Sequence, residues 1–201
     1  MSSVVHADID GRRARRHRNT DAVLDAVHAL FVEGLLEPTV EDIAARSGVS
    51  LRSVYRYFPD RDQLLQAALA RRLQVAEPLF HIVGLGEGSL EERIQRFADH
   101  RIELYERIAP TARAALSTST PLIADVVRRR RRQLAEQTST HFAPELDVLS
   151  DDEASDVLAA VETLCQFESL EALRVQRTLS PERTRAVLVR ALRALLVAPP
   201  D

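Results

Sequence analysis

Two arginines four residues apart, Arg52 and Arg56, have the chemistry and the spacing needed to bind nucleic acid. A guanidinium donates two parallel hydrogen bonds, and these match either the O6 and N7 atoms of guanine or a phosphate. At about 100° per residue, both arginines fall on the side of a helix opposite Val54. Two ordinary solvated arginines would show the same spacing, so the interpretation depends on the elements that position them.

The surrounding run, residues 39–58 (TVEDIAARSGVSLRSVYRYF), predicts two short helices joined by a tight turn. Thr39 can cap the first helix, with Asp42 as its capping-box partner. Gly48 is expected to end it, because glycine adopts the left-handed conformation without a Cβ penalty. Ser50 is placed to cap the second helix. This order of signals predicts a helix-turn-helix, whose second helix enters the DNA major groove.

Apolar residues are expected to hold the second helix against its neighbours. Val49 and Val54 have the spacing of a hydrophobic staple, which fixes the angle at which the chain enters a helix. Val54, Phe58 and, at the edge, Leu51 share one face and are expected to pack inward.

Positive charge is concentrated near the N-terminus. The 201 residues carry a formal net charge of -3, and residues 11–18 (GRRARRHR) hold five arginines, so the remainder sums to -3 minus 5, or -8. A basic run beside a DNA-reading element predicts an arm that follows phosphates or enters the minor groove. A disordered basic tail is the alternative interpretation.

Composition argues against several other classes of protein. The single cysteine, Cys165, excludes an internal disulfide and a multi-cysteine metal site. No apolar run of about 18 residues and no signal-peptide pattern occurs, so we expect a cytoplasmic protein that does not enter membranes. Residues 84–89 (GLGEGS) lack the spacing of a phosphate-binding loop, and we interpret them as a hinge. We expect no catalytic residues, no metal and no cofactor, and a helical enzyme is the remote alternative.

Helical signals extend along the whole chain and no strand pattern occurs, which predicts an all-α fold. The final two helices are apolar over a wide arc, and this favours a self-complementary dimer interface. The expected helices run from a cap at Asn19 or Thr20 to Gly34, from Asp60 toward Pro78, from Ser89 to Pro110, from Thr111 to about Leu116, from Pro121 past Arg132, from Ser150 through Leu173 and from Ser180 through Leu196.

Residues 19–69 resemble the TetR family of bacterial one-component regulators. The run TVEDIAARSGVSLRSVYRYFPDRDQLLQAAL follows the family's helix, Gly-Val-Ser turn, recognition helix with aromatic end, and leucine-rich helix. Residues 74–201 are similar mainly in helix layout and in FESLEALRVQRTLSPERTRAVLVRALRALL. The resemblance implies an N-terminal three-helix helix-turn-helix domain and a C-terminal helical ligand-binding and dimerisation domain. The implied divisions are 1–18 (basic arm), 19–73 (DNA-binding) and 74–201, with a homodimer formed through about 151–176 and 181–197.

The resemblance also implies which side chains contact double-stranded operator DNA. Arg52 departs from the family, since many members have glycine or a small residue there, so base preference cannot be carried over. Arg61 stands where the family usually has lysine, and a phosphate contact needs only a positively charged donor. The implied DNA-binding residues are Thr39, Ser50, Leu51, Arg52, Ser53, Tyr55, Arg56, Tyr57 and Arg61.

The resemblance further implies a repressor that a small-molecule effector releases from a partly palindromic operator. A ligand that favours one spacing of the two reading heads would weaken DNA affinity, with the helix from Asp60 to Pro78 as transmitter. A ligand-independent regulator or an activator is the alternative. Candidate ligand-binding residues, each of which could equally be an ordinary surface or core residue, are His81, His100, Arg101, Tyr105 and Thr111.

Overall fold

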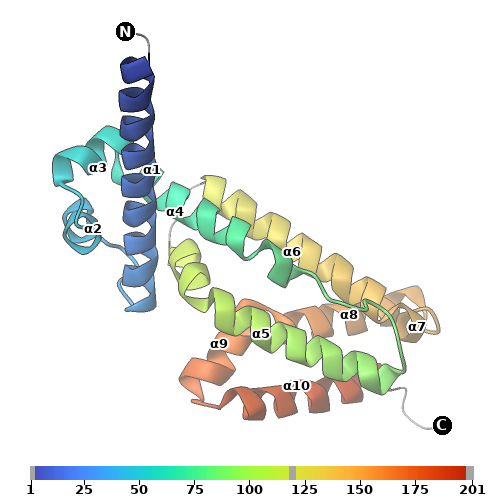
Figure 1. Cartoon of the computed structure of the whole chain (residues 1–201). Coiled ribbons are helices and arrows are strands. Elements are labelled where there is room, and N and C mark those ends of the chain that lie inside the picture. The colour runs from blue at the N-terminus through green and yellow to red at the C-terminus, as the bar shows by residue number, and fades with distance from the viewer. Residues whose placement is uncertain (1–2, 118–120, 198–201) are drawn as a thin grey trace. The chain divides into compact units, whose positions relative to one another are not determined.

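The computed structural model describes residues 3–117 and 121–197, with side chains from residue 11 onward except those of residues 12 and 122. Within these ranges every regular element is a helix (Figure 1), so the predicted all-α class is confirmed. The chain forms two compact units, Met1–Val75 with Pro110–Ile123, and Ala76–Ala109 with Ala124–Asp201. None of the described helices has the length and apolarity needed to cross a lipid bilayer.

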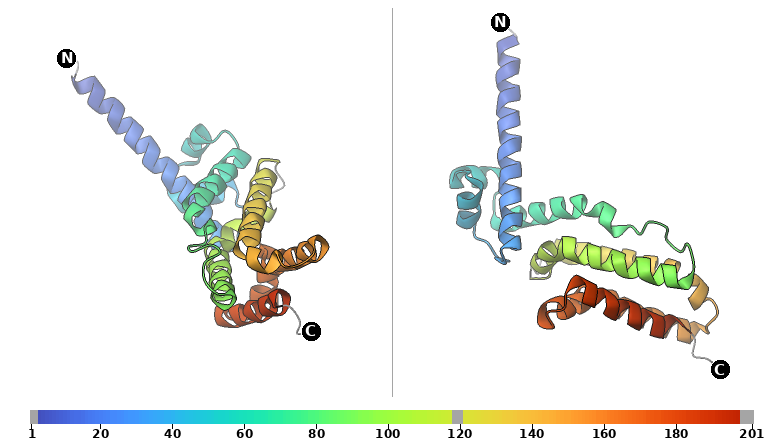
Figure 2. Two further views of the ribbon diagram at one scale, coloured as in Figure 1. Left: turned by 90° about the vertical axis from the view of Figure 1, so that its right-hand side faces the viewer. Right: turned by 60° about the horizontal axis from the view of Figure 1, so that its bottom comes forward.

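The first unit is built on one long helix. Helices α2, α3 and α4 pack against α1, and the views in Figure 2 show α2 and α3 beside it. Apolar residues of α1 at helical spacing, among them Val23, Val27 and Phe31, are buried with Ile43 and Leu64. The bounds are α1 (Ser3–Val32), α2 (Val40–Ser47), α3 (Leu51–Tyr57) and α4 (Arg61–Val75).

Helix α1 begins sixteen or more residues earlier than its sequence signals predicted. The expected start at Asn19 or Thr20 is wrong, because the basic run 11–18 belongs to the same continuous helix. Arginine and alanine favour helix, and only Gly11 in that run opposes it. The side chain of Asn19 is used elsewhere, as a hydrogen-bond donor to Tyr57.

The turn between α2 and α3 has the predicted geometry. The Thr39 hydroxyl accepts from the backbone N–H of Asp42 at 3.1 Å, and the Asp42 carboxylate accepts from the Thr39 N–H at 2.9 Å. Gly48 has φ 69°, the left-handed value expected of a helix end. Ser50 holds the cap position of α3, but its hydroxyl makes no cap bond and instead contacts Ser53 at 3.0 Å. The predicted cap by the Ser50 side chain is therefore wrong.

Two valines pack α3 against its neighbours, as expected, but the first residue of the helix is not buried. Val49 and Val54 are buried, whereas Leu51 is 38% exposed. Leu51 lies about 60° from Val54 around the helix and at its first turn, so it falls outside the strip that neighbouring helices cover. The expectation that Leu51 packs inward is wrong, and its exposure leaves it available for a partner.

The second unit is a helical bundle around one apolar core. Phe97, Phe142 and Leu188 are fully or almost fully buried at its centre, together with Leu192 and Val161. Its elements are η1 (Glu77–Phe80), α5 (Leu90–Ser117), α6 (Pro121–His141), α7 (Ala143–Leu146), α8 (Asp151–Cys165), α9 (Phe167–Glu171), the π-helical turn η2 (Ala172–Gln176) and α10 (Pro181–Leu196), with the end of α5 and the start of α6 assigned to the first unit.

Several helix ends differ from those predicted. α5 continues through Pro110 to Ser117, since buried alanines on both sides of the proline, Ala109 and Ala114, stabilise the helix despite the missing N–H. α8 stops at Cys165, where Gln166 is extended with ψ 163°, and no continuous helix reaches Leu173. The capping box of α8 and the Ser180 cap of α10 form as expected.

Candidate nucleic-acid interface

Tyr57 connects α3 to α1. Its phenol oxygen accepts hydrogen bonds from Asn19 Nδ2 at 3.3 Å and from Arg56 Nη2 at 3.1 Å. The guanidinium carbons of Arg56 and Arg16 lie 5.1 and 5.9 Å from the centre of its ring, within range of a cation–π contact. The hydrogen bond from Asn19, followed by that from Arg56, lowers the pKa of Tyr57. One ring thus brings an arginine of the basic run beside an arginine of α3.

The described arginines of this surface have no counter-ion among the described residues. Arg52 and Arg56 are exposed, and within the described residues neither has a carboxylate within 4.0 Å. Arg56 instead contacts two neutral oxygens, Ser53 Oγ at 3.4 Å and the Tyr57 phenol. The same holds along the start of α1 for the exposed side chains of Arg13, Arg15, Arg16 and Arg18.

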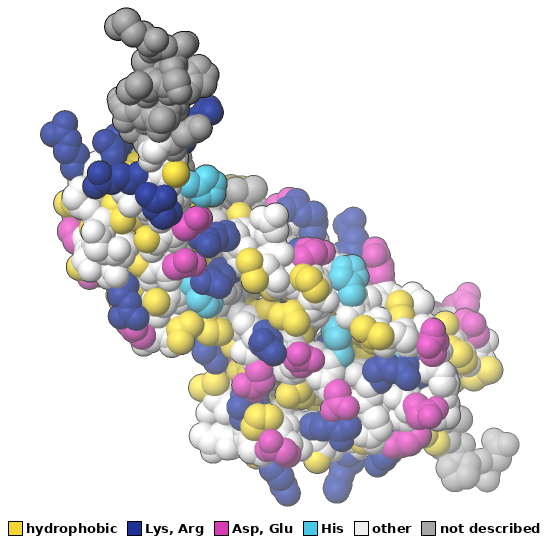
Figure 3. Space-filling model, viewed as in Figure 1, with side chains coloured by type: hydrophobic (Ala, Val, Ile, Leu, Met, Phe, Trp, Pro, Cys, Tyr) yellow, Lys and Arg dark blue, Asp and Glu magenta, His cyan; other side chains and the backbone are white. Residues whose placement is uncertain are grey.

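Other arginines of the first unit behave differently. Arg46 on α2 pairs with Glu33 at 2.5 Å. On α4, Arg71 pairs with Asp21 and Arg72 with Asp25, each at 3.2 Å. Figure 3 shows arginine side chains gathered beside α1 on the face in view. Cations without neighbouring acids keep their full attraction for an anion, so the face formed by α3 and the start of α1 is suited to phosphates.

The remaining residues that were predicted to contact DNA lie on α3 or at the starts of α2 and α4. Tyr55 is exposed on α3, and Ser53 is half-buried beside it. Thr39 is exposed, but its hydroxyl already serves the α2 cap. Arg61 Nε donates to the carbonyl of Pro38 at 2.8 Å, which joins the start of α4 to the residue before the α2 cap. This structural role of Arg61 had no signal in the sequence.

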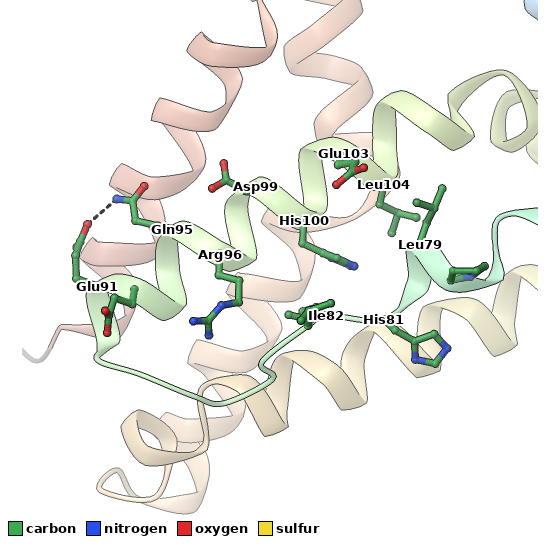
Figure 4. A pocket seen from close by; sticks show the side chains of 13 residues that line it. Leu79, His81, Ile82, Glu91, Gln95, Arg96, Asp99, His100, Glu103 and Leu104 are labelled. Atoms are coloured by element: carbon green, nitrogen blue, oxygen red, sulfur yellow. Dashed lines mark hydrogen bonds between the residues drawn. The ribbon is translucent and has the colours of Figure 1, made fainter.

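A separate cavity of about 680 Å³ lies entirely within the second unit, between η1 with the segment that follows it and the first half of α5. Figure 4 shows His100 reaching from α5 toward Leu79 and His81. The lining residues are Pro78, Leu79, His81, Ile82, Val83, Glu91, Glu92, Gln95, Arg96, Asp99, His100, Glu103 and Leu104.

The structure brings together only two of the five candidate ligand residues. His81 and His100 line the cavity, whereas the other three do not. Arg101 is buried and donates to the carbonyl of Leu134 on α6 at 3.1 Å. The Tyr105 hydroxyl contacts Glu171, and Thr111 is buried in the part of α5 that belongs to the first unit.

His100 is a half-buried polar side chain of the cavity lining. Its two ring nitrogens are buried and make no hydrogen bond of ordinary geometry among the described residues, although the backbone of Leu79 and His81 lies near enough to act on its pKa. Burial and, secondly, the positive charge of Arg101 lower the pKa of His100 to about 4. The ring is therefore neutral near pH 7, with one N–H donor and one acceptor nitrogen.

Sequence reasoning missed several polar residues of the cavity. Glu92, Arg96, Asp99 and Glu103 recur every three or four residues on one face of α5. That spacing was present in the sequence as a signal, but it also fits an ordinary solvated helix face. Among the described residues, no group of histidines, cysteines and carboxylates is arranged to hold a metal ion.

Known proteins resemble the chain along most of its length. Residues 23–68 match the family model described as bacterial regulatory proteins, tetR family. The HTH-type transcriptional regulator BetI of Escherichia coli O17:K52:H18 (strain UMN026 / ExPEC) is 28% identical over 155 residues, covering 73% of this chain and 77% of the relative.

Two solved structures share the fold. A tetR-family transcriptional regulator from Streptomyces coelicolor superposes with a TM-score of 0.65 at 24% identity, over 91% of this chain and 80% of the other. The structure described as a SmeT–triclosan complex superposes with a TM-score of 0.60 at 17% identity, over 88% and 90%. The helical architecture is therefore that of known regulators, with the matched segment spanning α2, α3 and parts of α1 and α4.

Proposed function

Because the chain belongs to the TetR family of bacterial regulatory proteins, we propose that it is a homodimeric repressor that a small molecule releases from a palindromic operator. The family consists of DNA-binding transcriptional regulators, and DNA binding by this chain follows from that likeness. In our proposal the bound protein represses transcription, and a ligand releases it. DNA, an effector and a second copy of the chain are its partners, in the cytoplasm.

One observation carries the DNA-binding part of the proposal: the arginines of α3 and α1 have no counter-ion among the side chains that the structure describes. In this proposal Arg52 and Arg56 contact bases or phosphates in the major groove, with Leu51, Ser53 and Tyr55 beside them. Thr39, Ser50, Tyr57 and Arg61 contact or position the phosphate backbone. The start of α1 adds phosphate contacts, since Arg16 lies near the same Tyr57 ring as Arg56.

The dimer would form through α8 to α10, about residues 151–176 and 181–197. Val157, Leu158 and Leu164 of α8 are only partly buried in a single chain, as are Phe167 and Leu195. A second copy related by a two-fold axis would cover them. The two DNA-binding domains of the dimer would then contact operator half-sites whose centres are about 34–36 Å apart, or a multiple of that distance.

Release would start at the cavity beside η1. Glu77–Phe80 follows directly on α4, and η1 is held by α6: Arg130 contacts the Glu77 carboxylate and lies 4.4 Å over the ring of Phe80. A ligand beside Leu79 and His81 would change the position of η1 and, through the chain, of α4. In this proposal residues 1–18 are the part of α1 that lies along the DNA backbone. Residues 19–73 are the DNA-binding domain, and residues 74–201 are the ligand-binding and dimerisation domain.

Sequence selection with the purified chain tests the proposal directly. Duplexes with a random central region, selected at about 0.15 M salt and then footprinted, should yield one palindromic sequence protected on two half-sites. Enrichment of an asymmetric sequence would contradict binding of DNA by a symmetric homodimer. Absence of any enriched sequence would contradict sequence-specific binding. Arg46→Ala, which removes an exposed arginine that already has an acidic partner, serves as the control variant and should select the same sequence.

A further inference from the structure

The arginines of α10 fall into two pairs on different sides of the helix. One pair contacts carboxylates of α5, through Arg185 with Asp99 and Arg193 with Glu91. The other pair, Arg183 and Arg190, is exposed, and no described carboxylate lies within 4.0 Å of either guanidinium. At about 100° per residue these two arginines are about 20° apart around the helix, on the side away from the buried Leu188. They form a basic stripe on the outer face of α10.

The outer face of α8 carries the opposite charge. Asp152 and Asp156 are exposed and one turn apart, and neither has a basic side chain within 4.0 Å in the part of the chain that the structure describes. Both lie on the side of α8 away from Val161, which is buried in the core. These two aspartates form an acidic stripe on α8, which packs beside α10 in the second unit.

Small side chains accompany the charges on both faces. Ala159 and Thr163 of α8 are exposed, as are Ala186 and Ala194 of α10. The distance between two packed helices depends on the side chains at their contact, so faces of this kind admit close approach. A helix of a second copy can therefore lie along either face, and the charged side chains decide which helix is favoured.

A two-fold dimer can stack these faces in two ways. In one arrangement α8 lies on α8 of the partner subunit and α10 on its α10, and each stripe then faces a stripe of the same charge. In the other arrangement α8 lies on α10 of the partner subunit, and by symmetry α10 lies on its α8. Every contact between stripes then joins opposite charges. Like charges placed opposite each other across an interface disfavour association, so the charges favour the second arrangement.

We propose that the two stripes select a second copy of this chain as partner and fix how it docks: α8 of each protomer lies on α10 of the other. Asp152 and Asp156 then face Arg183 and Arg190 of the partner subunit, twice in each dimer. This inference rests on the proposed function, because it names the residues that choose the partner at the same dimer surface.

The stripes have compatible lengths. At 1.5 Å per residue the two aspartates are about 6 Å apart along α8, and the two arginines are about 10.5 Å apart along α10. The long arginine side chains can lean toward each other to cover this difference. Charges at the exposed rim of an interface contribute mainly to the choice of partner. The affinity itself is assigned to the partly buried apolar residues of α8 to α10.

Charge reversal tests the inference. The pair Asp152→Arg and Asp156→Arg makes both stripes basic, whereas Arg183→Asp and Arg190→Asp makes both acidic. Each two-residue variant alone should dimerise at least about ten-fold more weakly than the wild type in sedimentation equilibrium at about 0.15 M salt, because like charges then face each other twice. An equimolar mixture should form the heterodimer instead, since both of its contacts join opposite charges. Native mass spectrometry separates the three dimers by mass.

Two controls separate charge pairing from damage to the fold. The variant with all four substitutions has every local cost of the two-residue variants, including arginines at the start of α8, yet its facing stripes again have opposite charges. Its dimerisation should return close to that of the wild type. Glu136→Arg and Arg132→Asp reverse exposed charges of α6 outside both stripes, and neither should change dimerisation.

The inference is overturned if either two-residue variant dimerises as tightly as the wild type, which is the result expected when each helix lies on its own symmetry mate. A mixture without an excess of heterodimer, or a four-residue variant as weak as its parents, overturns it too. A wild-type protein that stays monomeric both free and on operator DNA rejects the dimer of the proposed function. A wild-type dimer whose variants dimerise equally well rejects only the selection by charge.

Discussion

The amide of Asn19 donates to the phenol oxygen of Tyr57 at 3.3 Å, so the helix that carries the basic run is fixed to the second helix of the helix-turn-helix. Asn19 and Tyr57 are 38 residues apart in sequence. Their contact places Arg16 and Arg56 on one surface, and the surface rather than α3 alone is the candidate DNA interface.

Tyr57→Phe should weaken operator binding without unfolding the protein. The ring remains, but the hydrogen bonds from Asn19 and Arg56 are lost, and each hydrogen bond contributes about 0.5–1.5 kcal/mol. Fluorescence anisotropy with labelled operator should report a several-fold loss of affinity. Urea unfolding should show a small loss of stability for Tyr57→Phe and none for Tyr55→Phe, because no contact of the Tyr55 hydroxyl is formed in the described part of the chain.

Arg52→Ala and Arg56→Ala should each lower operator affinity, with about 1–3 kcal/mol of lost discrimination for at least one of them. Both arginines are exposed and without counter-ions, so neither substitution is expected to affect folding. Arg46→Ala, in the neighbouring helix, is the matched control and should bind operator like the wild type. Binding of the double variant at wild-type strength and specificity would show that α3 is not the reading helix.

Deleting residues 1–17 should flatten the salt dependence of binding. Each lost phosphate contact reduces the slope of log K against log salt by about 0.9 for duplex DNA. Replacing Arg13, Arg15 and Arg16 by glutamine tests three of the deleted side chains while keeping the length of the chain. If the slope is unchanged in both variants, the start of α1 makes no phosphate contacts.

Glu145→Ala should destabilise the protein by about 3–5 kcal/mol. Glu145 and Arg93 form an ion pair with side chains only 15% and 7% exposed, and removing one partner leaves the other charge buried and unpaired. Glu168→Ala provides the comparison, since its pair with Arg131 is about half exposed and should cost less than about 1 kcal/mol. Urea unfolding measures both, and similar losses would contradict the burial argument.

Stability should fall as the pH is lowered from about 6.5 to about 4. The pKa of His100 is lowered from 6.5 to about 4, so in this window the unfolded chain binds a proton that the folded chain does not. Its contribution is complete above pH 6.5 and is lost toward the folded pKa. The slope from one such group is at most about 1.4 kcal/mol per pH unit. Burial also lowers the pKa of His141, so His100→Gln should reduce the slope of unfolding free energy against pH without abolishing it.

Local signals were enough to predict the helix-turn-helix. The Thr39 box, the left-handed Gly48 and the buried Val54 depend on neighbours within a few residues, and all three form. The helix start at Asn19 could not be predicted correctly, because that side chain has a partner on α3 that is distant in sequence. The predicted helix end at Pro110 was wrong because Ala109 and Ala114 on either side of it are buried, which the sequence does not reveal. The break at Gln166 was not predicted.

The cavity was harder to predict than the DNA-binding surface. His100 and His81 were candidates because they are polar residues in helical surroundings, and both line it. Arg101, adjacent in sequence to His100, faces α6 instead, since one residue along a helix turns the side chain by about 100°. Periodicity identifies a face of α5, but only packing shows which face adjoins η1.

The continuity of α1 from Ser3 to Val32 gives the basic run a fixed reach. At 1.5 Å per residue, the eight steps from Gly11 to Asn19 span about 12 Å of stiff helix. A flexible tail would lose chain entropy on ordering along DNA and could adapt to operators of different shape. A helix that is already formed cannot adapt in this way, so DNA that bends away from α1 would lose all the phosphate contacts of the basic run at once. The protein would therefore select DNA by its curvature as well as by its sequence.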